Sequence, residues 1–276
     1  MLLPHGIHVL RHKWLSRATI PELVSRAVLA ENAVLHNRHT GQRCFILGNG
    51  PSVKQLDLTM LKGQNVISVS NGYLHQGYAS FAPRYHCLPQ VTYGKMTRES
   101  VVAWFNEMHQ HLGNAELFLN ETEAELVREY GLFSGRKVHY VVMRESFDEL
   151  EEREVIDITR PIPRVGSVPV LAIILAMYMG FKEIILLGVD HDHFKTGKYV
   201  YAFETKVQKD KDYSVSSDGT VVTTWYDDFQ TLARLWRQYR ILGEIASASK
   251  ISIVNATAGG ELDEFQRREF QSLFSL

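Results

Sequence analysis

The sequence predicts an α/β fold built on a doubly wound, mostly parallel sheet. From Arg43 onward, short apolar runs alternate with segments of helical periodicity. Several of these runs are continuous, which is typical of strands covered by helices on both faces. The length of 276 residues, with 45% hydrophobic and 22% charged residues, suits one large α/β domain. Ligands of such sheets bind outside the carboxyl ends of the strands, so residues that follow each strand are candidates for a site.

Residues 1–42 are expected to form an N-terminal helical extension, followed by one α/β domain over residues 43–276. A helix is predicted for Thr19–Asn37, because Thr19 can cap it and Pro21 suits its first turn. Four basic residues lie in or before this helix: Arg11, Lys13, Arg17 and Arg26. A basic amphipathic helix can contact an anionic membrane surface, and the alternative is a helix packed on the domain with its charges solvated.

The expected strands, in chain order, are Cys44–Leu47, Asn65–Val69, Arg84–Leu88, Ala115–Leu119, Val138–Val142, Glu183–Val189 and Ile251–Val254. The expected helices between and after them are Glu99–His111, Thr122–Tyr130, Gly166–Met179 and Trp225–Ala248. The last helix has the clearest apolar face, which starts at Phe229 and includes Tyr239. The segment Lys195–Thr224 is polar and too long for a plain connection, which predicts a lid-like loop.

Composition and charge exclude several classes of protein. The formal net charge is −1 and the pI is about 6.9, so no global basic field indicates a nucleic-acid partner. Cys44 and Cys87 lie in apolar runs without metal-type spacing, which favours buried free thiols in a reducing compartment. The longest apolar run, Val168–Met179, is too short to cross a membrane, and the N-terminus lacks the apolar centre of a signal peptide. We therefore expect a cytoplasmic protein, for which peripheral contact with the inner membrane through the basic helix is the alternative to a helix packed on the domain.

The first candidate for a binding loop is Gly48-Asn49-Gly50-Pro51-Ser52, where the first apolar run stops abruptly. Glycines let backbone N–H groups approach a ligand closely, Pro51 fixes the exit angle, and Ser52 can cap a following helix. Phosphate-bearing ligands bind at strand ends of this kind. The alternative is an ordinary tight turn.

Polar residues also follow other strands. Asn71 and Gln90 come after the second and third strands, where their amides can bind a base or a ribose. Gly166 and Ser167 open the apolar helix, and a helix N-terminus favours an anion. The alternatives are a turn residue for Asn71 and a simple helix cap for Ser167.

The segment Asp190-His191-Asp192-His193 is the densest chemical cluster of the chain. A histidine beside carboxylates can act as a general base near neutral pH. The same pattern could hold a divalent metal, but no further ligands of suitable spacing accompany it, so we prefer the base and expect no metal. A solvated surface loop is the alternative, and Asp190 also suits a structural capping role. Tyr201, among several lysines, can stabilise a leaving phosphate, unless this segment is a solvated charged loop.

An ordered set of motifs resembles the bacterial sialyltransferases that build lipooligosaccharide. It also resembles the related motility accessory factor and 6-hydroxymethylpterin diphosphokinase-like proteins. The resemblance spans about residues 43–255. The motifs are Gly48-Asn-Gly-Pro-Ser52, Ser70-Asn71, Gly166-Ser167, Gly180-Phe-Lys-Glu-Ile-Ile-Leu-Leu-Gly-Val-Asp190 and Tyr201-Ala-Phe-Glu204.

This resemblance implies a metal-independent inverting transferase on a Rossmann-like sheet, with a CMP-linked nonulosonic acid as donor. It implies that Asn49, Gly50 and Ser52 contact the phosphate and ribose of the nucleotide. Asn71 would contact the nucleotide or sugar, and Ser167 lies where the family places a threonine near the donor. Tyr201 falls where the sialyltransferases keep a tyrosine on the departing phosphate.

The chain departs from the sialyltransferase pattern at three places. The Thr-Ser-Gly turn is replaced by Ser167-Val-Pro169, and the asparagine after the third strand by Leu88, with Gln90 nearby. The catalytic histidine of the family follows the Tyr-Ala-Phe motif, but residues 206–224 contain no histidine. His191 or His193 is then the natural substitute for the base.

The leading hypothesis is a nucleotide-sugar-dependent glycosyltransferase that acts on a glycan or protein acceptor in bacterial surface glycan assembly. The alternative is an ATP- and Mg-dependent 6-hydroxymethylpterin diphosphokinase-like enzyme, in which Asp190 and Asp192 would coordinate the ion. A third reading is a non-catalytic member that binds a nucleotide or a partner. The sequence leaves open whether the chain forms a homo-oligomer.

Overall fold

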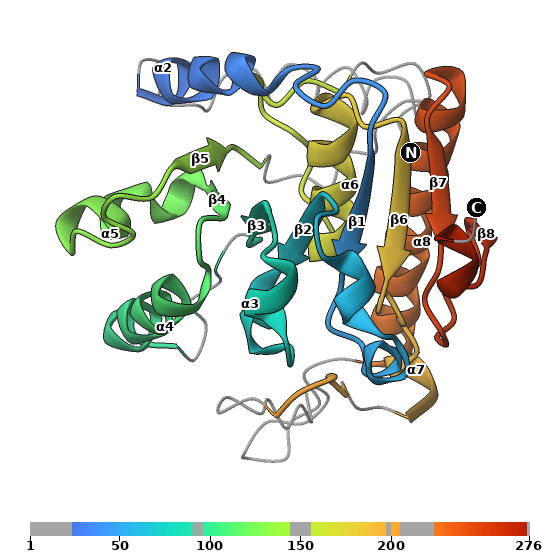
Figure 1. Cartoon of the computed structure of the whole chain (residues 1–276). Coiled ribbons are helices and arrows are strands. Elements are labelled where there is room, and N and C mark those ends of the chain that lie inside the picture. Colours follow the sequence, from blue (N-terminus) through green and yellow to red (C-terminus); the bar gives the residue numbers. More distant parts are fainter. Residues whose placement is uncertain are drawn as a thin grey trace, which may run out of the picture.

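The computed structural model of the chain describes residues 24–89, 91, 96–143, 156–196, 200–204 and 224–274. They form one open sheet of eight strands in which every neighbouring pair is parallel. The strands are β1 Arg43–Leu47, β2 Val66–Val69, β3 Tyr85–Cys87, β4 Glu116–Asn120, β5 Val138–Val141, β6 Glu183–Leu187, β7 Ser252–Asn255 and β8 Gln266–Arg267. The predicted α/β class and parallel sheet are therefore confirmed (Figure 1).

The spatial order of the strands is β5-β4-β3-β2-β1-β6-β7-β8. The chain starts in the middle of the sheet at β1, adds strands outward to β5, and then returns to build the other half from β6. β1 and β6 are neighbours, with Leu47 opposite Leu187 at their carboxyl ends. This reversal of direction occurs between β1 and β6, and sheets of this type bind ligands in the crevice outside the carboxyl ends of the strands at such a point.

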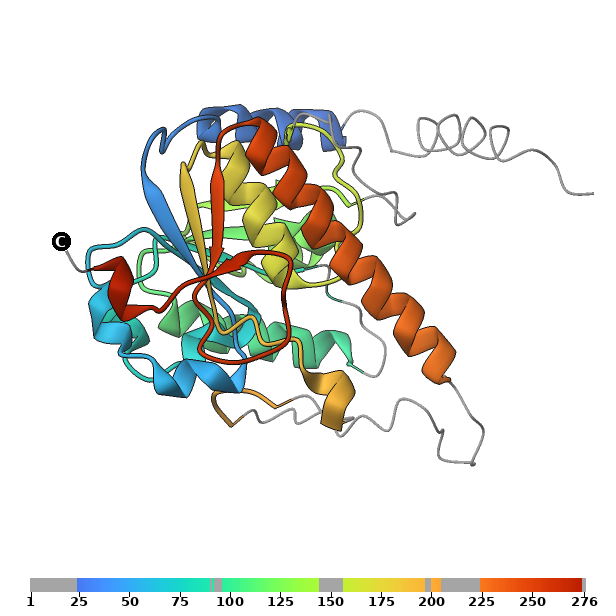
Figure 2. The ribbon, with the colours of Figure 1, turned by 90° about the vertical axis from the view of Figure 1, so that its right-hand side faces the viewer.

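Helices and short 3₁₀ segments cover both faces of the sheet (Figure 2). The α-helices are α2 Val24–Ala30, α3 Tyr78–Phe81, α4 Arg98–His111, α5 Ala124–Glu129, α6 Val168–Tyr178, α7 His193–Thr196 and α8 Trp225–Ala248. The 3₁₀ segments are η1 Glu31–Leu35, η2 Pro51–Gln55, η3 Leu58–Leu61, η4 Ser70–Leu74, η5 Glu121–Glu123 and η6 Gln271–Leu273.

Alternate residues of the strands point to two separate hydrophobic cores. Ile46 and Ile184 belong to the core under α6 and α8, whereas Phe45 and Leu187 belong to the core under α3, α4 and α5. Burial on both faces explains why the strands are continuous apolar runs in the sequence. α6 is apolar all round because it lies between the sheet and α8, with residues 169–178 all buried.

Most predicted elements are confirmed, and the differences have physical reasons. The helix predicted up to Asn37 ends at Leu35 and changes at Glu31 from α2 to the 3₁₀ segment η1; residues 19–23 lie outside the described residues. The buried Asn32 amide donates to Tyr140 O and Ile158 O, which ties this segment to the sheet. β8 was not predicted, because it is only two residues long and both are exposed. The division of the chain at residue 42 stays a prediction.

The apolar face of α8 is buried over a shorter length than predicted. The helix spans the predicted residues, and Thr224 and Asp227 form a capping box at its N-terminus. However, Phe229 is 57% exposed, and burial begins at Leu235. The first turns of α8 extend beyond the sheet, so their apolar side chains have no layer to pack against (Figure 2).

Three further predictions concern the cysteines, a membrane-spanning helix and the long polar loop. Cys44 and Cys87 are free and buried, as expected. In the described segments, no helix combines the length and the apolar character that a membrane span requires. Of the predicted lid-like loop Lys195–Thr224, only residues 195, 196, 200–204 and 224 are described.

Candidate functional site

A pocket of about 290 Å³ lies at the carboxyl edge of the sheet, beside the ends of β1, β2 and β6. In Figure 1 this is the edge to which the arrowheads of β1 and β6 point, toward α7. Its lining includes most of the residues that the sequence singled out: Asn49, Gly50, Pro51, Asn71, Gly166, Ser167, Asp190, His191, His193 and Tyr201. Gly48 and Ser52 do not line it, and Gln90 lies outside the described residues.

Gly48 and Gly50 are required by contacts within the protein. Gly48 N–H donates to Leu187 O at 2.7 Å, and Gly50 N–H donates to Gly188 O at 2.9 Å. A Cβ atom at Gly48 would overlap Gly188 O, and one at Gly50 would overlap Asp190 Oδ2. The two glycines allow the loops after β1 and β6 to approach each other, and their N–H groups donate within the protein. Their predicted close approach to a ligand stays a prediction.

Asp190 joins the same two loops through Ser52. Ser52 Oγ donates to Asp190 Oδ2 at 2.8 Å, and Ser52 N–H donates to Asp190 Oδ1 at 3.2 Å. Burial raises the pKa of Asp190, and the two bonds from Ser52 oppose that rise. Asp190 thus has the structural capping role that the sequence suggested, because its carboxylate accepts from the Ser52 N–H group in the first turn of η2. Ser52 is not the N-cap, because η2 begins at Pro51 with Gly50 at that position. A direct ligand contact of Ser52 stays a prediction.

Asn49 is held by its neighbours on both sides. Its Nδ2 donates to Val69 O at 3.0 Å, and its Oδ1 accepts from His75 Nε2 at 3.2 Å. His75 Nε2 also donates to Gly48 O at 2.9 Å, and burial lowers the pKa of this imidazole to about 4. Nothing in the sequence indicates a role for His75, because its position between two loops is a tertiary property.

Tyr201 is placed over the pocket by the Asn49 backbone. Ala202 N–H donates to Asn49 O at 2.9 Å, and the Phe203 ring packs edge-on against His75 with 4.9 Å between centroids. The Tyr201 ring stacks on Phe203 and is 40% exposed. Burial raises the pKa of Tyr201, so its phenol is protonated at neutral pH and can donate a hydrogen bond.

Asn71 presents only part of its amide to the pocket. Trp104 Nε1 donates to Asn71 Oδ1 at 2.8 Å, which fixes the amide orientation and turns its NH₂ group away from Trp104. The preceding Ser70 has a left-handed backbone with φ of 48°. Its carbonyl accepts from the buried His86 Nε2 at 2.8 Å. Asn71 lines the pocket with its amide oxygen held by Trp104, and its contact with a ligand stays a prediction.

Ser167 occupies the N-cap position of α6 but makes no capping hydrogen bond. Its Oγ lies 2.9 Å from the Tyr239 hydroxyl instead. The turn before it is held by α8, because Gly166 N–H donates to Gln238 Oε1 at 2.8 Å and Gln238 Nε2 donates to Arg164 O at 2.9 Å. A simple helix cap is therefore the wrong explanation for Ser167. The positive end of the α6 dipole lies at the pocket wall without a side-chain cap.

His191 shares the same tyrosine. Its Nε2 lies 2.7 Å from the Tyr239 hydroxyl, and its backbone φ of 48° turns the chain after β6 toward α8. Burial, with a smaller contribution from His193, lowers the pKa of His191 to about 4. The imidazole is therefore neutral at pH 7 and able to accept a proton. Tyr239 was expected only as part of an apolar helix face, because nothing in the sequence indicates that its hydroxyl reaches two loops.

His193 and Asp192 complete this side of the pocket, and His193 begins α7. Within the described ranges, no three His, Cys, Asp or Glu side chains converge in a way that could hold a metal ion. Both Asp190 oxygens accept from Ser52, so this carboxylate is committed to a contact within the protein. A magnesium site at Asp190 and Asp192 stays a prediction.

The buried histidines around the pocket make the fold sensitive to acid. Burial lowers the pKa of His75 and His191 to about 4 and that of His86 to about 3, from the ordinary 6.5. The unfolded chain therefore binds protons on these groups between pH 6.5 and 4 while the folded chain does not, so the free energy of unfolding falls as pH falls.

From pH 7 to pH 5.5 we expect a loss of about 1 kcal/mol per histidine, or on the order of 3 kcal/mol for the three. Urea unfolding at the two pH values measures this change. A free energy of unfolding that is equal or higher at pH 5.5 would contradict the burial of these neutral imidazoles.

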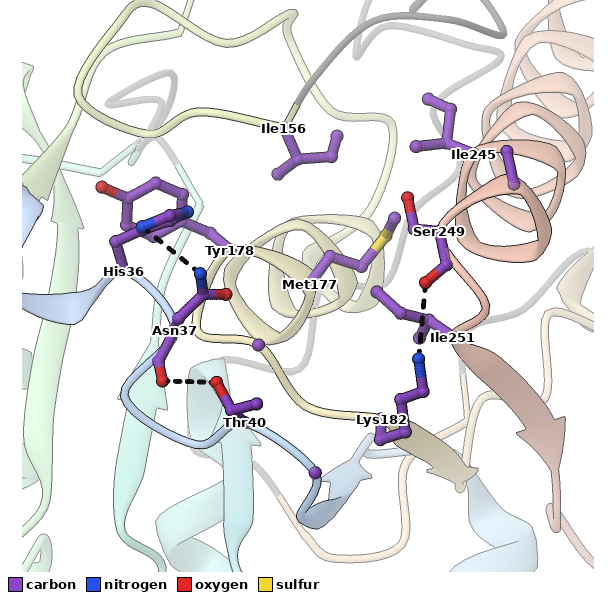
Figure 3. Close-up of a pocket in the computed structure, with 13 residues that line it drawn as sticks. His36, Asn37, Thr40, Ile156, Met177, Tyr178, Lys182, Ile245, Ser249 and Ile251 are labelled. Carbon is purple, nitrogen blue, oxygen red and sulfur yellow. Dashed lines mark hydrogen bonds between the residues drawn. The ribbon is translucent and has the colours of Figure 1, made fainter.

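A second cavity, of about 420 Å³, lies at the opposite edge of the sheet, near the start of β6 (Figure 3). The ends of α6 and α8 form two of its walls. Lys182 Nζ is 3.5 Å from Ser249 O, and the His36 and Tyr178 rings lie 5.2 Å apart. None of the residues predicted for the site lines this cavity. This cavity lies at the amino edge of the sheet, whereas ligands of sheets of this type bind at the carboxyl edge. It can therefore serve as an internal control in ligand-binding experiments.

No protein-family model matches the sequence, and no curated protein matches it. Similar solved structures include the sialyltransferase CstII from Campylobacter jejuni in complex with the substrate analogue cytidine-5'-monophosphate. That similarity has 16% identity and a TM-score of 0.42, and it covers 84% of this chain and 88% of that one. CstII with CMP-3FNeuAc gives 14% identity and a TM-score of 0.42 over 82% and 84% of the two chains. A single-residue variant of Cst-II in complex with CMP has 15% identity and a TM-score of 0.39, and the similarity covers 82% of this chain and 88% of that one.

Proposed function

We propose that this protein is a glycosyltransferase that uses a nucleotide-activated sugar, with a CMP-linked nonulosonic acid as the donor. The acceptor is the hydroxyl of a glycan or a protein in bacterial surface glycan assembly. One observation carries the proposal: residues from the loops after β1, β2 and β6, the N-terminus of α6 and the segment 200–204 line a single pocket at the β1/β6 crevice.

The α6 N-terminus is the positive end of this pocket. Val168 and Pro169 line it beside Ser167, whose hydroxyl does not cap the helix. Peptide N–H groups and the helix dipole favour a phosphate at such a position. The buried Asp190 carboxylate is turned toward Ser52, so its charge is bound within the protein rather than offered to the phosphate.

The reaction we propose is a single displacement with inversion and without a metal. The acceptor oxygen attacks the anomeric carbon, the bond from that carbon to the phosphate oxygen breaks, and CMP leaves with the electron pair. His191, which is neutral at pH 7, or His193 accepts the acceptor proton. The Tyr201 phenol donates a hydrogen bond to the departing phosphate, which stabilises the charge that develops there.

The nucleotide part of this proposal is tested by thermal unfolding with added ligands. CMP at about 100 times its dissociation constant is expected to stabilise the fold by about 2.7 kcal/mol. For a chain of this size, that raises the Tm by roughly 5 °C. Cytidine, which lacks the phosphate, is expected to give a much smaller shift, and UMP and GMP are expected to give smaller shifts than CMP. Equal shifts from every nucleotide, or no shift from any, would count against a CMP-linked donor.

A further inference from the structure

We infer that the Tyr239 hydroxyl couples Ser167 to His191, so that a ligand accepting a hydrogen bond from Ser167 selects the tautomer of the His191 imidazole. The inference rests on the proposed function only in taking that ligand to be an anion. It makes Tyr239 a positioning residue of the pocket, although Tyr239 itself does not line it.

The geometry of this coupling is a continuous chain of three polar groups. Ser167 Oγ and the Tyr239 hydroxyl are 2.9 Å apart, and the hydroxyl and His191 Nε2 are 2.7 Å apart. Tyr239 has no exposed surface, so water does not compete for its hydroxyl. Ser167 and His191 both line the pocket, on opposite sides of this buried link.

Neighbouring contacts hold each member in place. Gln238, adjacent to Tyr239 on α8, fixes the turn that carries Ser167 through its bonds to Gly166 N–H and Arg164 O. The His191 ring packs against Tyr239 and Trp236, with centroids at 5.5 Å and 5.9 Å. These contacts hold the two loops and α8 in place. The hydrogen-bonding protons of Ser167, Tyr239 and His191 are therefore the part of this arrangement that can change position.

The chain of hydrogen bonds can run in two directions. In the first, Ser167 donates to the Tyr239 oxygen, Tyr239 donates to His191 Nε2, and the imidazole proton is on Nδ1. In the second, His191 Nε2–H donates to the Tyr239 oxygen, Tyr239 donates to Ser167 Oγ, and Nδ1 is unprotonated. Burial raises the pKa of Tyr239 and lowers that of His191, so both groups are neutral at pH 7 in either direction.

An anion at Ser167 favours the second direction. When the Ser167 hydroxyl donates to a phosphate or carboxylate oxygen, its proton is no longer available to Tyr239. Tyr239 then donates to Ser167 Oγ and accepts from His191 Nε2–H, because each oxygen in the chain needs one donor and one acceptor. The His191 Nδ1 lone pair is free in this state, so binding of the anionic donor prepares a histidine that can accept a proton.

The test reads the His191 tautomer by ¹⁵N NMR of the histidine-labelled full-length protein at pH 7, with CMP and inorganic phosphate as probes. Four proteins are compared: wild type, Tyr239→Phe, Ser167→Ala and Tyr85→Phe. Tyr85→Phe is a matched control, because Tyr85 is equally buried and its hydroxyl lies 2.7 Å from His39 Nε2 at the other end of the sheet.

In wild type and Tyr85→Phe, CMP or phosphate is expected to raise the Nε2–H fraction of His191 several-fold. In Tyr239→Phe the ligand still binds, with a Kd within about threefold of wild type, but the tautomer ratio no longer responds. Ser167→Ala without any ligand is expected to shift His191 the opposite way, toward Nδ1–H, because Tyr239 then has only His191 as a partner.

Each other outcome is decisive. A ligand-dependent tautomer change that persists in Tyr239→Phe, or its absence in wild type that binds CMP, overturns the coupling. If wild type binds neither CMP nor phosphate, the proposed function is wrong, but the coupling through Tyr239 can still be tested. The test is then the His191 tautomer ratio in ligand-free Ser167→Ala. An unchanged His191 ratio in that variant overturns the coupling.

Discussion

Gly50→Ala is expected to destabilise the protein by roughly 3 kcal/mol and to abolish nucleotide binding. The added Cβ would overlap Asp190 Oδ2 and would come within 2.8 Å of Gly188 O. Asp190 cannot move without losing its bonds to Ser52 N–H and Oγ, which would leave buried polar groups unpaired. Overpacking and a lost bond to a charged group each cost about 1–3 kcal/mol. Urea unfolding and CMP titration measure the two effects.

Gly72→Ala is the matched control for this substitution. Gly72 lies on the next loop of the same site, but a Cβ there would meet Asn49 Oδ1 and Ser68 Cβ at 3.4 Å, which is an ordinary contact distance. We expect its effect on the free energy of unfolding to be within about 1 kcal/mol of wild type. Equal stability of both variants would show that the two loops are not packed as closely as described.

His191→Ala is expected to lower kcat by about 10²–10⁴ while changing the Kd for CMP by less than about threefold. The neutral imidazole is held by Tyr239 at the pocket wall, and loss of a general base removes an interaction made only in the transition state. In the proposed site, other groups, chiefly the α6 N-terminus, bind the donor, so its affinity is expected to change little. Turnover of the CMP-linked donor with saturating acceptor, together with CMP titration, separates the two quantities.

His193→Ala provides the comparison for this second substitution. It removes the other histidine of the cluster but leaves the bond between His191 and Tyr239 intact. We expect a loss in kcat of less than about tenfold, because His191 keeps its position and can still accept the proton. A large loss in His193→Ala with none in His191→Ala would move the base to His193, and no loss in either variant would remove the base from this cluster.

The sequence was sufficient for the parallel sheet class, for seven of its eight strands and for the edge at which the pocket lies. β1 and β6 are continuous apolar runs because both of their faces are buried, and that pattern is local enough to find without tertiary information. In a parallel sheet, the residues after each strand lie at one edge. Positions as distant as Asn49, Asn71 and His191 could therefore be assigned to one site before their contacts were known.

The contacts that organise the pocket could not be predicted, because they depend on partners far away in the chain. Gly50 is required by the close approach of Asp190, and Ser167, for which a helix cap was the alternative to an anion contact, pairs with Tyr239 instead of capping α6. Tyr239 fits the helical apolar pattern, and its hydroxyl gives no separate signal in the sequence. His75 is likewise placed by tertiary contacts to Gly48 and Asn49.

The central claim is that a CMP-linked donor binds in the pocket at the carboxyl edge of the sheet. Hydrogen–deuterium exchange of the full chain with and without CMP tests it most directly, because the chain has a second and larger cavity at the opposite edge. We predict that CMP slows exchange in segments 48–52, 69–71, 166–171 and 188–193. Slowed exchange at 36–41 and 177–182, with no change around the first pocket, would contradict the account.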